Sequence, residues 1–110
     1  MGDRATLKVV LLGCGVVGAA VYRLLAEQSA DLSARAGAAL EVVGVAVRDP
    51  GRPRMVAVPP GLLTTDAAAL VSRPDVDIVI ELMGGIEPAR TLVLAALNAG
   101  KSVEIGRAHV

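Results

Sequence analysis

The apolar positions of the chain fall into two kinds of pattern. Residues 9–12, 40–47 and 77–83 form nearly continuous apolar runs, as strands do when both faces of a parallel sheet are covered. Around these runs, apolar residues recur at intervals of three and four, which is the spacing of a helix with one buried face. This alternation predicts an α/β fold in which helices cover both faces of a parallel sheet.

The first helix is expected directly after the first run, and we expect it to fade near residues 28–30. Its predicted buried stripe consists of Val17, Val21, Leu24 and Leu25. Residues 29–39 are interpreted as the helix end and a loop, and the proline-rich residues 50–61 as a second loop. A short helix through Ser72 follows, with Thr65 or Asp66 as its N-cap.

The last predicted helix begins at Pro88, which fits a first helical turn, and Glu87 is favourable near its N-terminus. Gly100 is the expected residue just past its end. Its predicted buried stripe consists of Ala89, Leu92, Val93, Ala96 and Leu97. Residues 101–103 then begin another strand.

The turn between the first strand and the first helix carries Gly13, Gly15 and Gly18 in the spacing G-x-G-x-x-G. Between a strand and a helix, this spacing is typical of Rossmann-type dinucleotide-binding domains. Gly13 allows the tight turn, Gly15 lets a pyrophosphate approach the backbone, and Gly18 lets the helix lie close to the strand. A glycine turn without a ligand, and the similar turn that methyltransferases use for another adenosine ligand, are the alternatives.

Three neighbours of these glycines complete the predicted phosphate site. The amides of Gly15, Val16 and Val17 are expected to point at the pyrophosphate, because the start of a helix favours negative charge. Cys14 lies within the same turn, where a small side chain is required. It serves there as a packing residue or, alternatively, as a reactive thiol.

The second strand runs directly into Arg48 and Asp49. In dinucleotide-binding folds an acid at this place binds the ribose 2′-hydroxyl, whereas an arginine suits a 2′-phosphate. Because Arg48 comes first and offers a planar fork of donors, we favour NADP over NAD. In the alternative interpretation Arg48 is a solvated strand end and Asp49 caps the following turn.

Two further features lie near the end of the third apolar run, where ligands bind in open α/β sheets. Gly84 and Gly85 form a second place at which the backbone is able to approach a cofactor. Glu81 stands late in a buried run and must be paired or face the crevice. A structural role and a substrate-side role both fit it.

Composition narrows the function further. The chain has 110 residues, one tyrosine and no phenylalanine or tryptophan, so we expect one domain with an aliphatic core. Eleven basic and eleven acidic residues cancel, which gives no electrostatic support for nucleic acid or an anionic membrane as a partner. A single cysteine excludes an internal disulfide and a cysteine metal site. With no membrane-length apolar run and no signal peptide, we expect a cytoplasmic protein.

The apolar pattern breaks after Val103. Residues 104–110, EIGRAHV, suit neither a strand nor a helix, and the same residues result from translating a common sequencing-library adapter. We therefore expect residues 1–103 to be a partial nucleotide-binding domain, residues 104–110 a non-native tail, and the substrate-binding and catalytic domain to be absent. The alternative is a genuine short tail. In the adapter interpretation His109, the only histidine, has no biological role.

Four segments together resemble the N-terminal half of homoserine dehydrogenase. They are VVLLGCGVVG, EVVGVAVRD, PDVDIVIELMGGIEPAR and LNAGKSV. The element ELMGGIEPAR followed by NAGKSV is more specific than the glycine turn. Val16 departs from the family, which often has threonine there, so a hydroxyl near the pyrophosphate is lost while the backbone amides remain.

The resemblance implies NAD(P)-dependent interconversion of L-homoserine and L-aspartate 4-semialdehyde, on the route to threonine, methionine and isoleucine. By this similarity the glycine turn holds the pyrophosphate, Arg48 the 2′-phosphate, and Gly84 and Gly85 lie near the nicotinamide. The substrate and its catalytic residues belong to the full-length parent, a homo-oligomer, so this chain alone is expected to be inactive. A stand-alone NADP(H)-binding module and another Rossmann reductase of the aspartate pathway are the alternatives.

Overall fold

The structure is a computed structural model that describes residues 6–13, 15–27, 39–49, 51, 58–83 and 89–105. Its five strands are all parallel and lie in the order β3-β2-β1-β4-β5. Their bounds are β1 Thr6–Leu12, β2 Ala39–Ala46, β3 Leu63–Thr64, β4 Ile78–Glu81 and β5 Ser102–Ile105. The predicted parallel α/β sheet is confirmed, and the three apolar runs are β1, β2 and β4.

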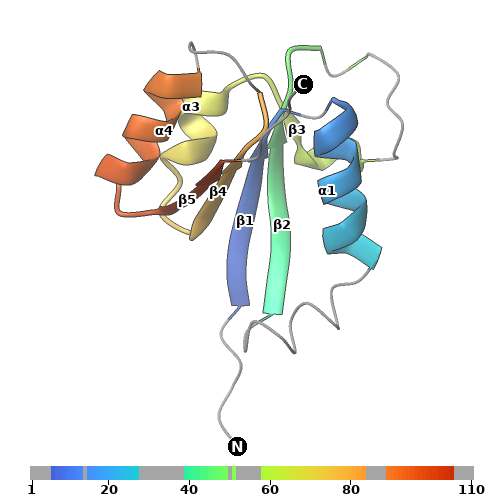
Figure 1. Ribbon diagram of the computed structural model, residues 1–110, viewed down its shortest axis with the longest axis horizontal. Helices are drawn as coiled ribbons and strands as arrows, with labels where there is room; N and C mark the ends of the chain where they lie inside the picture. Colours follow the sequence, from blue (N-terminus) through green and yellow to red (C-terminus); the bar gives the residue numbers. More distant parts are fainter. Residues whose placement is uncertain are drawn as a thin grey trace, which may run out of the picture.

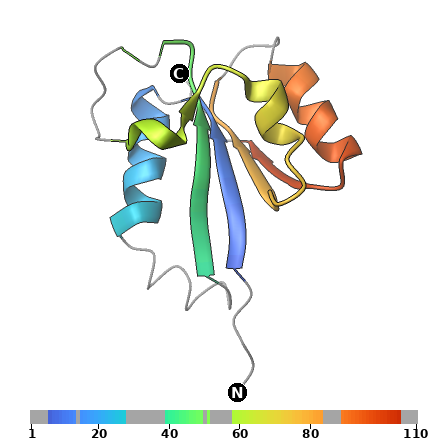
Figure 2. The ribbon, with the colours of Figure 1, turned by 180° about the vertical axis from the view of Figure 1, so that it is seen from behind.

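Helices cover both faces of the sheet, as predicted (Figures 1 and 2). Helix α1, Val16–Glu27, lies on one face, and α3, Ala67–Val71, lies beside α4, Ala89–Asn98, on the other. A short 3-10 helix, η1 Pro60–Leu62, leads into β3. Strand β1 is therefore the central strand. The chain first adds β2 and β3 on one side of β1 and then crosses back to add β4 and β5 on the other side.

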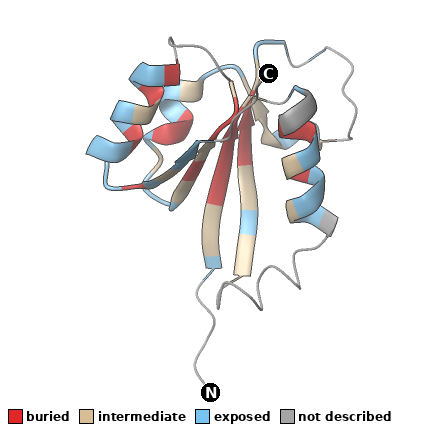
Figure 3. Ribbon diagram, viewed as in Figure 1, coloured by how far each residue is buried: buried red, intermediate tan, exposed pale blue. Residues whose placement is uncertain are grey.

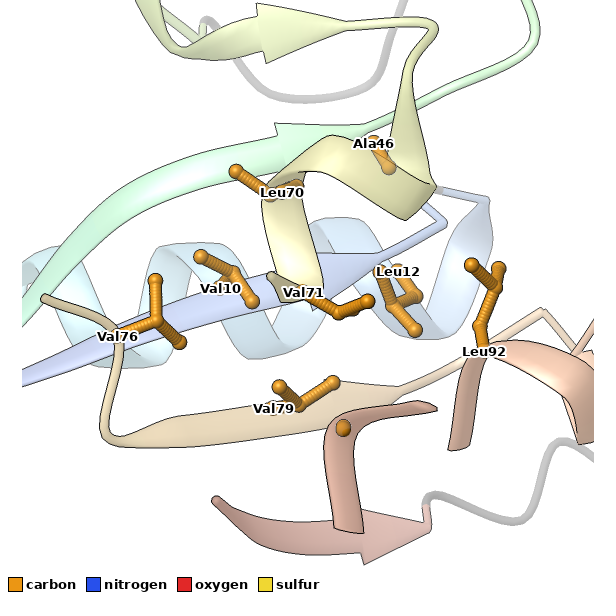
Figure 4. Packing of buried hydrophobic residues seen from close by; sticks show 9 residues of the cluster. Val10, Leu12, Ala46, Leu70, Val71, Val76, Val79 and Leu92 are labelled. Atoms are coloured by element: carbon orange, nitrogen blue, oxygen red, sulfur yellow. The ribbon is translucent and has the colours of Figure 1, made fainter. Parts of the chain in front are cut away.

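Successive side chains of β1 enter two separate cores, because neighbouring residues of a strand point to opposite faces. Val10 and Leu12 pack with the helices α3 and α4, whereas Val9 and Leu11 pack on the α1 side with Tyr22. Figure 4 shows the first cluster, and Figure 3 shows that burial is greatest in the upper halves of β1 and β2. The core is aliphatic apart from Tyr22, as the composition predicts.

Helix α1 differs from the expected orientation. Leu24, predicted to be buried, is 44 % exposed, while Val21 and Leu25 are half-buried. Among the side chains of α1 that the structure describes, which do not include that of Val17, the buried positions are Gly18, Ala19 and Tyr22. The helix is rotated so that its one aromatic side chain, which buries the largest apolar area, faces the sheet instead of Leu24.

Helix α3 begins as expected. Its N-cap is Asp66, whose side chain accepts a hydrogen bond from the N–H of Ala69 at 3.0 Å. Thr65, the other candidate, does not fill this position. The Oγ1 of Thr64 accepts from the N–H of Asp66 and holds the approach to the cap.

Helix α4 ends at the predicted glycine. Gly100 has a φ of 82°, its N–H donates to the carbonyl of Leu97, and the N–H of Lys101 donates to the carbonyl of Ala96. These two bonds make a Schellman motif. The predicted stripe is buried at Ala89, Leu92 and Ala96 and half-buried at Val93, but Leu97 is 52 % exposed. Pro88 and Glu87 lie outside the described residues.

Strand β5 continues beyond the point at which the sequence pattern breaks. Glu104 pairs with Ile80 and Ile105 pairs with Glu81, so the expectation that no strand extends past Val103 is wrong. Backbone groups make these bonds, and both side chains are exposed, so no apolar pattern is needed. The origin of residues 104–110 is a separate question and stays a prediction.

Candidate functional site

The candidate site lies at the carboxyl ends of β1, β2 and β4, which meet at one edge of the sheet. Gly13 directly follows β1, and its N–H donates to the carbonyl of Ala46 at the end of β2 at 2.8 Å. On the other side of β1, the N–H of Leu82 donates to the carbonyl of Leu12 at 2.9 Å. Since the course of the chain reverses at β1, this edge is the crevice in which doubly wound sheets bind their ligands.

Gly13 meets two requirements that favour glycine. Its φ of 102° lies in the left-handed region. A Cβ at this position would also lie 3.3 Å from the Cγ of Met83 and 3.4 Å from the carbonyl carbon of Leu82. The tight turn predicted from the sequence is therefore confirmed, and the segment after β4 packs directly against it.

Gly15 stands at the start of α1 and faces open space. Its carbonyl accepts the N–H of Ala19 at 2.8 Å, so the helical hydrogen bonds begin from this residue. Gly15 is exposed, and a Cβ placed on it would meet no atom within 4 Å. The first amides of a helix lack partners inside the helix, and the start of α1 includes Val16 and Val17. Open space beside such amides fits an anionic group.

Gly18 lies in the next turn of α1 and is buried. Helix α1 contacts both β1 and β2. The role of Gly18 in the close approach of helix and strand stays a prediction. The structure therefore places Gly13, Gly15, Val16, Val17 and Gly18 along one continuous segment, from the end of β1 into the first turns of α1. Three predicted site residues, Cys14, Gly84 and Gly85, lie outside the described residues.

Arg48 and Asp49 follow β2 at the same edge, and both are exposed. Arg48 is two residues beyond Ala46, whose carbonyl accepts the hydrogen bond from Gly13. The Oδ1 of Asp49 accepts the N–H of Gly51 at 3.0 Å, which closes a turn after the strand. The prediction that Asp49 caps the turn after β2 is therefore confirmed. This hydrogen bond does not decide whether Arg48 binds a ligand.

Glu81, at the end of β4, is 5 % exposed. Its Oε2 accepts the N–H of Met83 at 2.6 Å, which ties the end of the strand to the bend that packs on Gly13. Among the described residues, every buried polar side-chain atom has a hydrogen-bond partner. This bond gives Glu81 a structural task at the edge of the site. Met83 itself carried no signal in the sequence.

One pocket lies apart from this edge. It has a volume of about 210 Å³ and is formed by β2, β3 and α3, including Gly44, Thr64, Leu70 and Arg73. None of the predicted site residues lines it. Within the described part of the chain, no cluster of three or more His, Cys, Asp or Glu side chains is placed to hold a metal ion. In that same part, no helix has the length and apolar character needed to cross a membrane.

Known proteins match both the sequence and the fold. The sequence model of the family described as "Homoserine dehydrogenase, NAD binding domain" matches residues 13–106. Homoserine dehydrogenase of Corynebacterium glutamicum is 53 % identical over 102 residues, which cover 93 % of this chain and 23 % of that protein. The enzyme of Mycobacterium tuberculosis is 47 % identical over the same coverage.

Solved structures agree. A crystal structure of S. aureus homoserine dehydrogenase has a TM-score of 0.87 at 27 % identity, covering 98 % of this chain and 28 % of that one. The homoserine dehydrogenase of Thiobacillus denitrificans has a TM-score of 0.79 at 35 % identity and 24 % coverage of its own chain. This chain thus spans about a quarter of the length of the relatives that it matches. It belongs to the homoserine dehydrogenase family, in which it corresponds to the domain that binds the nicotinamide dinucleotide.

Proposed function

We propose that this chain is the cofactor-binding part of a cytoplasmic homoserine dehydrogenase that interconverts L-homoserine and L-aspartate 4-semialdehyde with NADP. The family match and the glycine turn support this proposal. Neither a nucleic acid nor a membrane is a partner of the parent enzyme, which is a homo-oligomer. The chain alone is inactive, because hydride transfer needs substrate and cofactor held together and the chain spans only a quarter of its relatives.

The main observation in support of a cofactor site at the glycine turn is the open space beside Gly15. The amides of Gly15, Val16 and Val17 hold the pyrophosphate, with Cys14 inside the same turn and Gly18 behind it. Gly13 turns the chain tightly enough for the phosphates to reach these amides. Gly84 and Gly85 lie toward the nicotinamide, which accepts or donates the hydride when the cofactor is bound.

The cofactor is NADP rather than NAD. One carboxylate oxygen of Asp49 accepts a hydrogen bond from the N–H of Gly51. Asp49 therefore stabilises its own turn and is less suited to bind a ribose hydroxyl. Arg48 is exposed at the edge that carries the glycine turn, and its guanidinium suits a 2′-phosphate.

Gly15→Ala tests the cofactor site. A methyl group at Gly15 meets nothing in the chain, so we expect the thermal midpoint to move by less than about 2 °C. The same methyl group lies where the pyrophosphate must approach, so we expect NADPH to bind at least about 10-fold more weakly by fluorescence titration.

Gly61→Ala is the matched control, because a Cβ at Gly61 also meets nothing within 4 Å and Gly61 lies outside the glycine turn. It should leave both the thermal midpoint and NADPH binding unchanged. If Gly15→Ala binds NADPH as tightly as Gly61→Ala does, the cofactor does not lie on this turn.

We also propose that the native part of this chain stops at Val103, that residues 104–110 are translated adapter, and that the parent gene continues past this point. The agreement of residues 104–110 with the translated adapter supports this view, whereas the family model matches through residue 106. An independent read of the gene past the codon for Val103 tests it. A continuation into a substrate-binding domain is expected, whereas a stop codon after Val110 contradicts the proposal and favours a stand-alone binding module.

A further inference from the structure

Glu81 is a buried charged residue in an otherwise apolar strand. It is the last residue of β4, it is 5 % exposed, and it is paired in register with Leu12 of β1 and Ile105 of β5. Burial of a carboxylate costs free energy unless hydrogen bonds compensate it, so glutamate is rarely buried without a partner. At the edge of the sheet that carries the candidate site, we expect such a residue to hold another group in place.

The carboxylate of Glu81 holds the chain just past the end of β4. The N–H of Leu82 still bonds to a neighbouring strand, since it donates to the carbonyl of Leu12 at 2.9 Å. The next N–H, that of Met83, instead donates to Oε2 of Glu81 at 2.6 Å. A hydrogen bond to a charged acceptor is stronger than one between neutral groups. Glu81 therefore fixes the position of Met83, where the regular strand has already ended.

Met83 and Leu82 lie against the first residue of the glycine turn. A Cβ on Gly13 would lie 3.3 Å from the Cγ of Met83 and 3.4 Å from the carbonyl oxygen of Leu82. On its other side, Gly13 donates its N–H to the carbonyl of Ala46 at 2.8 Å. Gly13 is thus held between the chain ends of β2 and β4, at the edge where the strands converge (Figure 1).

We propose that Glu81 is a positioning residue of the cofactor site. Its carboxylate holds Met83 against Gly13, and the position of Gly13 sets where the amide of Gly15 lies at the start of α1. Donors bind an anion more tightly when they are held in place before the anion arrives. This inference rests on the proposed pyrophosphate site, and it adds a residue that acts on that site through Met83 and Gly13.

Glu81→Met and Glu81→Gln separate this role from a contribution to stability. Methionine has a similar length but no oxygen to accept the N–H of Met83, whereas glutamine keeps an uncharged one. Lys101→Met is the matched control, because it also removes a buried, charged and hydrogen-bonded group, but at the amino ends of β4 and β5. All variants are made in the 110-residue chain and measured at a temperature at which circular dichroism shows each of them to be folded.

Hydrogen exchange without cofactor tests the link from Glu81 to the glycine turn. The rate at the amide of Gly13, which is bonded to Ala46, is divided by the rate at the amide of Leu11 in the same strand, so that a change in global stability cancels. This ratio should rise by about 5-fold or more in Glu81→Met. It should change by less than about 2-fold in Lys101→Met and rise by an intermediate amount in Glu81→Gln.

Fluorescence titration with NADPH tests the consequence for the cofactor. Glu81→Met should bind NADPH at least about 10-fold more weakly, Glu81→Gln about 2- to 3-fold more weakly, and Lys101→Met as tightly as the unmodified chain. Met83→Ala removes the contact with Gly13 and should weaken binding by about 5-fold or more. Because Glu81 acts through Met83, the double variant Glu81→Met with Met83→Ala should bind no more weakly than the weaker single variant.

Several outcomes overturn the proposal. They are an unchanged exchange ratio or unchanged NADPH affinity in Glu81→Met, equal weakening by Lys101→Met, and additive losses in the double variant. If Glu81→Met does not fold, Met83→Ala decides, and unchanged Gly13 exchange and NADPH affinity in that variant contradict the proposal. Weakened binding in Gly15→Ala but not in Glu81→Met refutes only the role of Glu81, whereas unchanged binding in Gly15→Ala refutes the cofactor site itself.

Discussion

The ammonium group of Lys101 donates a hydrogen bond to the carbonyl of Val76 at 3.0 Å, across the connection that joins α3 to β4. The same nitrogen donates a second hydrogen bond to the carbonyl of Arg73 at 2.6 Å. Lys101 is 8 % exposed and sits where α4 ends and β5 begins. One buried side chain therefore joins two connections that are separated by 25 residues or more.

Lys101→Met should destabilise the fold. Methionine keeps the apolar stem but removes both hydrogen bonds of the ammonium group. The carbonyl of Arg73 still accepts the N–H of Val76 at 3.2 Å, whereas the carbonyl of Val76 loses its Lys101 donor. The free energy of unfolding should therefore fall by about 1–3 kcal/mol in urea denaturation. Lys8→Met serves as the control, because Lys8 is more exposed and makes only a 3.7 Å ion pair with Asp75. Its loss should cost at most about 1 kcal/mol. If both variants lost the same free energy of unfolding, the two buried hydrogen bonds of Lys101 would contribute no more to stability than the exposed ion pair of Lys8.

Helix α3 packs closely against the sheet at Gly44. A Cβ at Gly44 would collide with the Cδ1 of Leu70, which is buried. Gly44→Ala should therefore lower the free energy of unfolding by about 1–3 kcal/mol through overpacking. Adding Leu70→Ala makes room, so the double variant should lose less than the sum of the two single changes. Additive losses would mean that the two side chains do not collide.

Arg73 and Asp75 form a two-point ion pair, with the Nε and Nη2 of Arg73 at 3.0 and 2.7 Å from the two carboxylate oxygens. These hydrogen bonds hold the pKa of the Asp75 carboxyl below its usual range, with a smaller contribution from the charge of Lys8. A lowered pKa in the folded state adds stability above the unfolded pKa of about 3.9, and this stability is lost as the pH falls through the folded value.

Arg73→Gln should therefore raise the pKa of Asp75 in an NMR titration. Asp75→Asn should make the free energy of unfolding less dependent on pH below about pH 4. Because the pair is exposed, the effect on stability should be small. An Asp75 pKa that does not move in the Arg73 variant would assign the shift to another group.

Arg48→Ala should change the choice of cofactor in a full-length enzyme that carries this domain. Loss of a guanidinium beside a 2′-phosphate should weaken NADPH binding by about 10- to 100-fold and leave NADH binding unchanged. Lys8→Ala removes the same charge from the first half of β1, away from the strand ends that carry the site, and should affect neither cofactor. Equal weakening for both cofactors would refute contact with the 2′-phosphate.

Local features of the fold followed from the sequence because neighbouring residues cause them. The apolar runs became β1, β2 and β4, Asp66 caps α3, and Gly100 ends α4. The glycine turn was likewise predictable, because the conformation of Gly13 and the start of α1 are set within a few residues. Within the candidate site, the glycine turn and its position after β1 were the parts that the sequence predicted correctly.

Only the tertiary structure decided which way each helix faces and which distant groups meet. Leu24 and Leu97 fit an apolar stripe as well as Tyr22 and Ala96 do, and packing against the sheet chose between them. The two-residue strand β3 is too short to show a period. The burial of Lys101 depends on carbonyls 25 and 28 residues away, so it cannot be predicted from a local sequence pattern. The sequence by itself determined β1, β2 and β4, the glycine turn and the helix caps at Asp66 and Gly100, because these depend on local backbone preference and periodicity. The rotation of the helices, the short strand β3 and the bond from Lys101 to Val76 were decided by tertiary structure, because they depend on contacts between residues far apart in the chain.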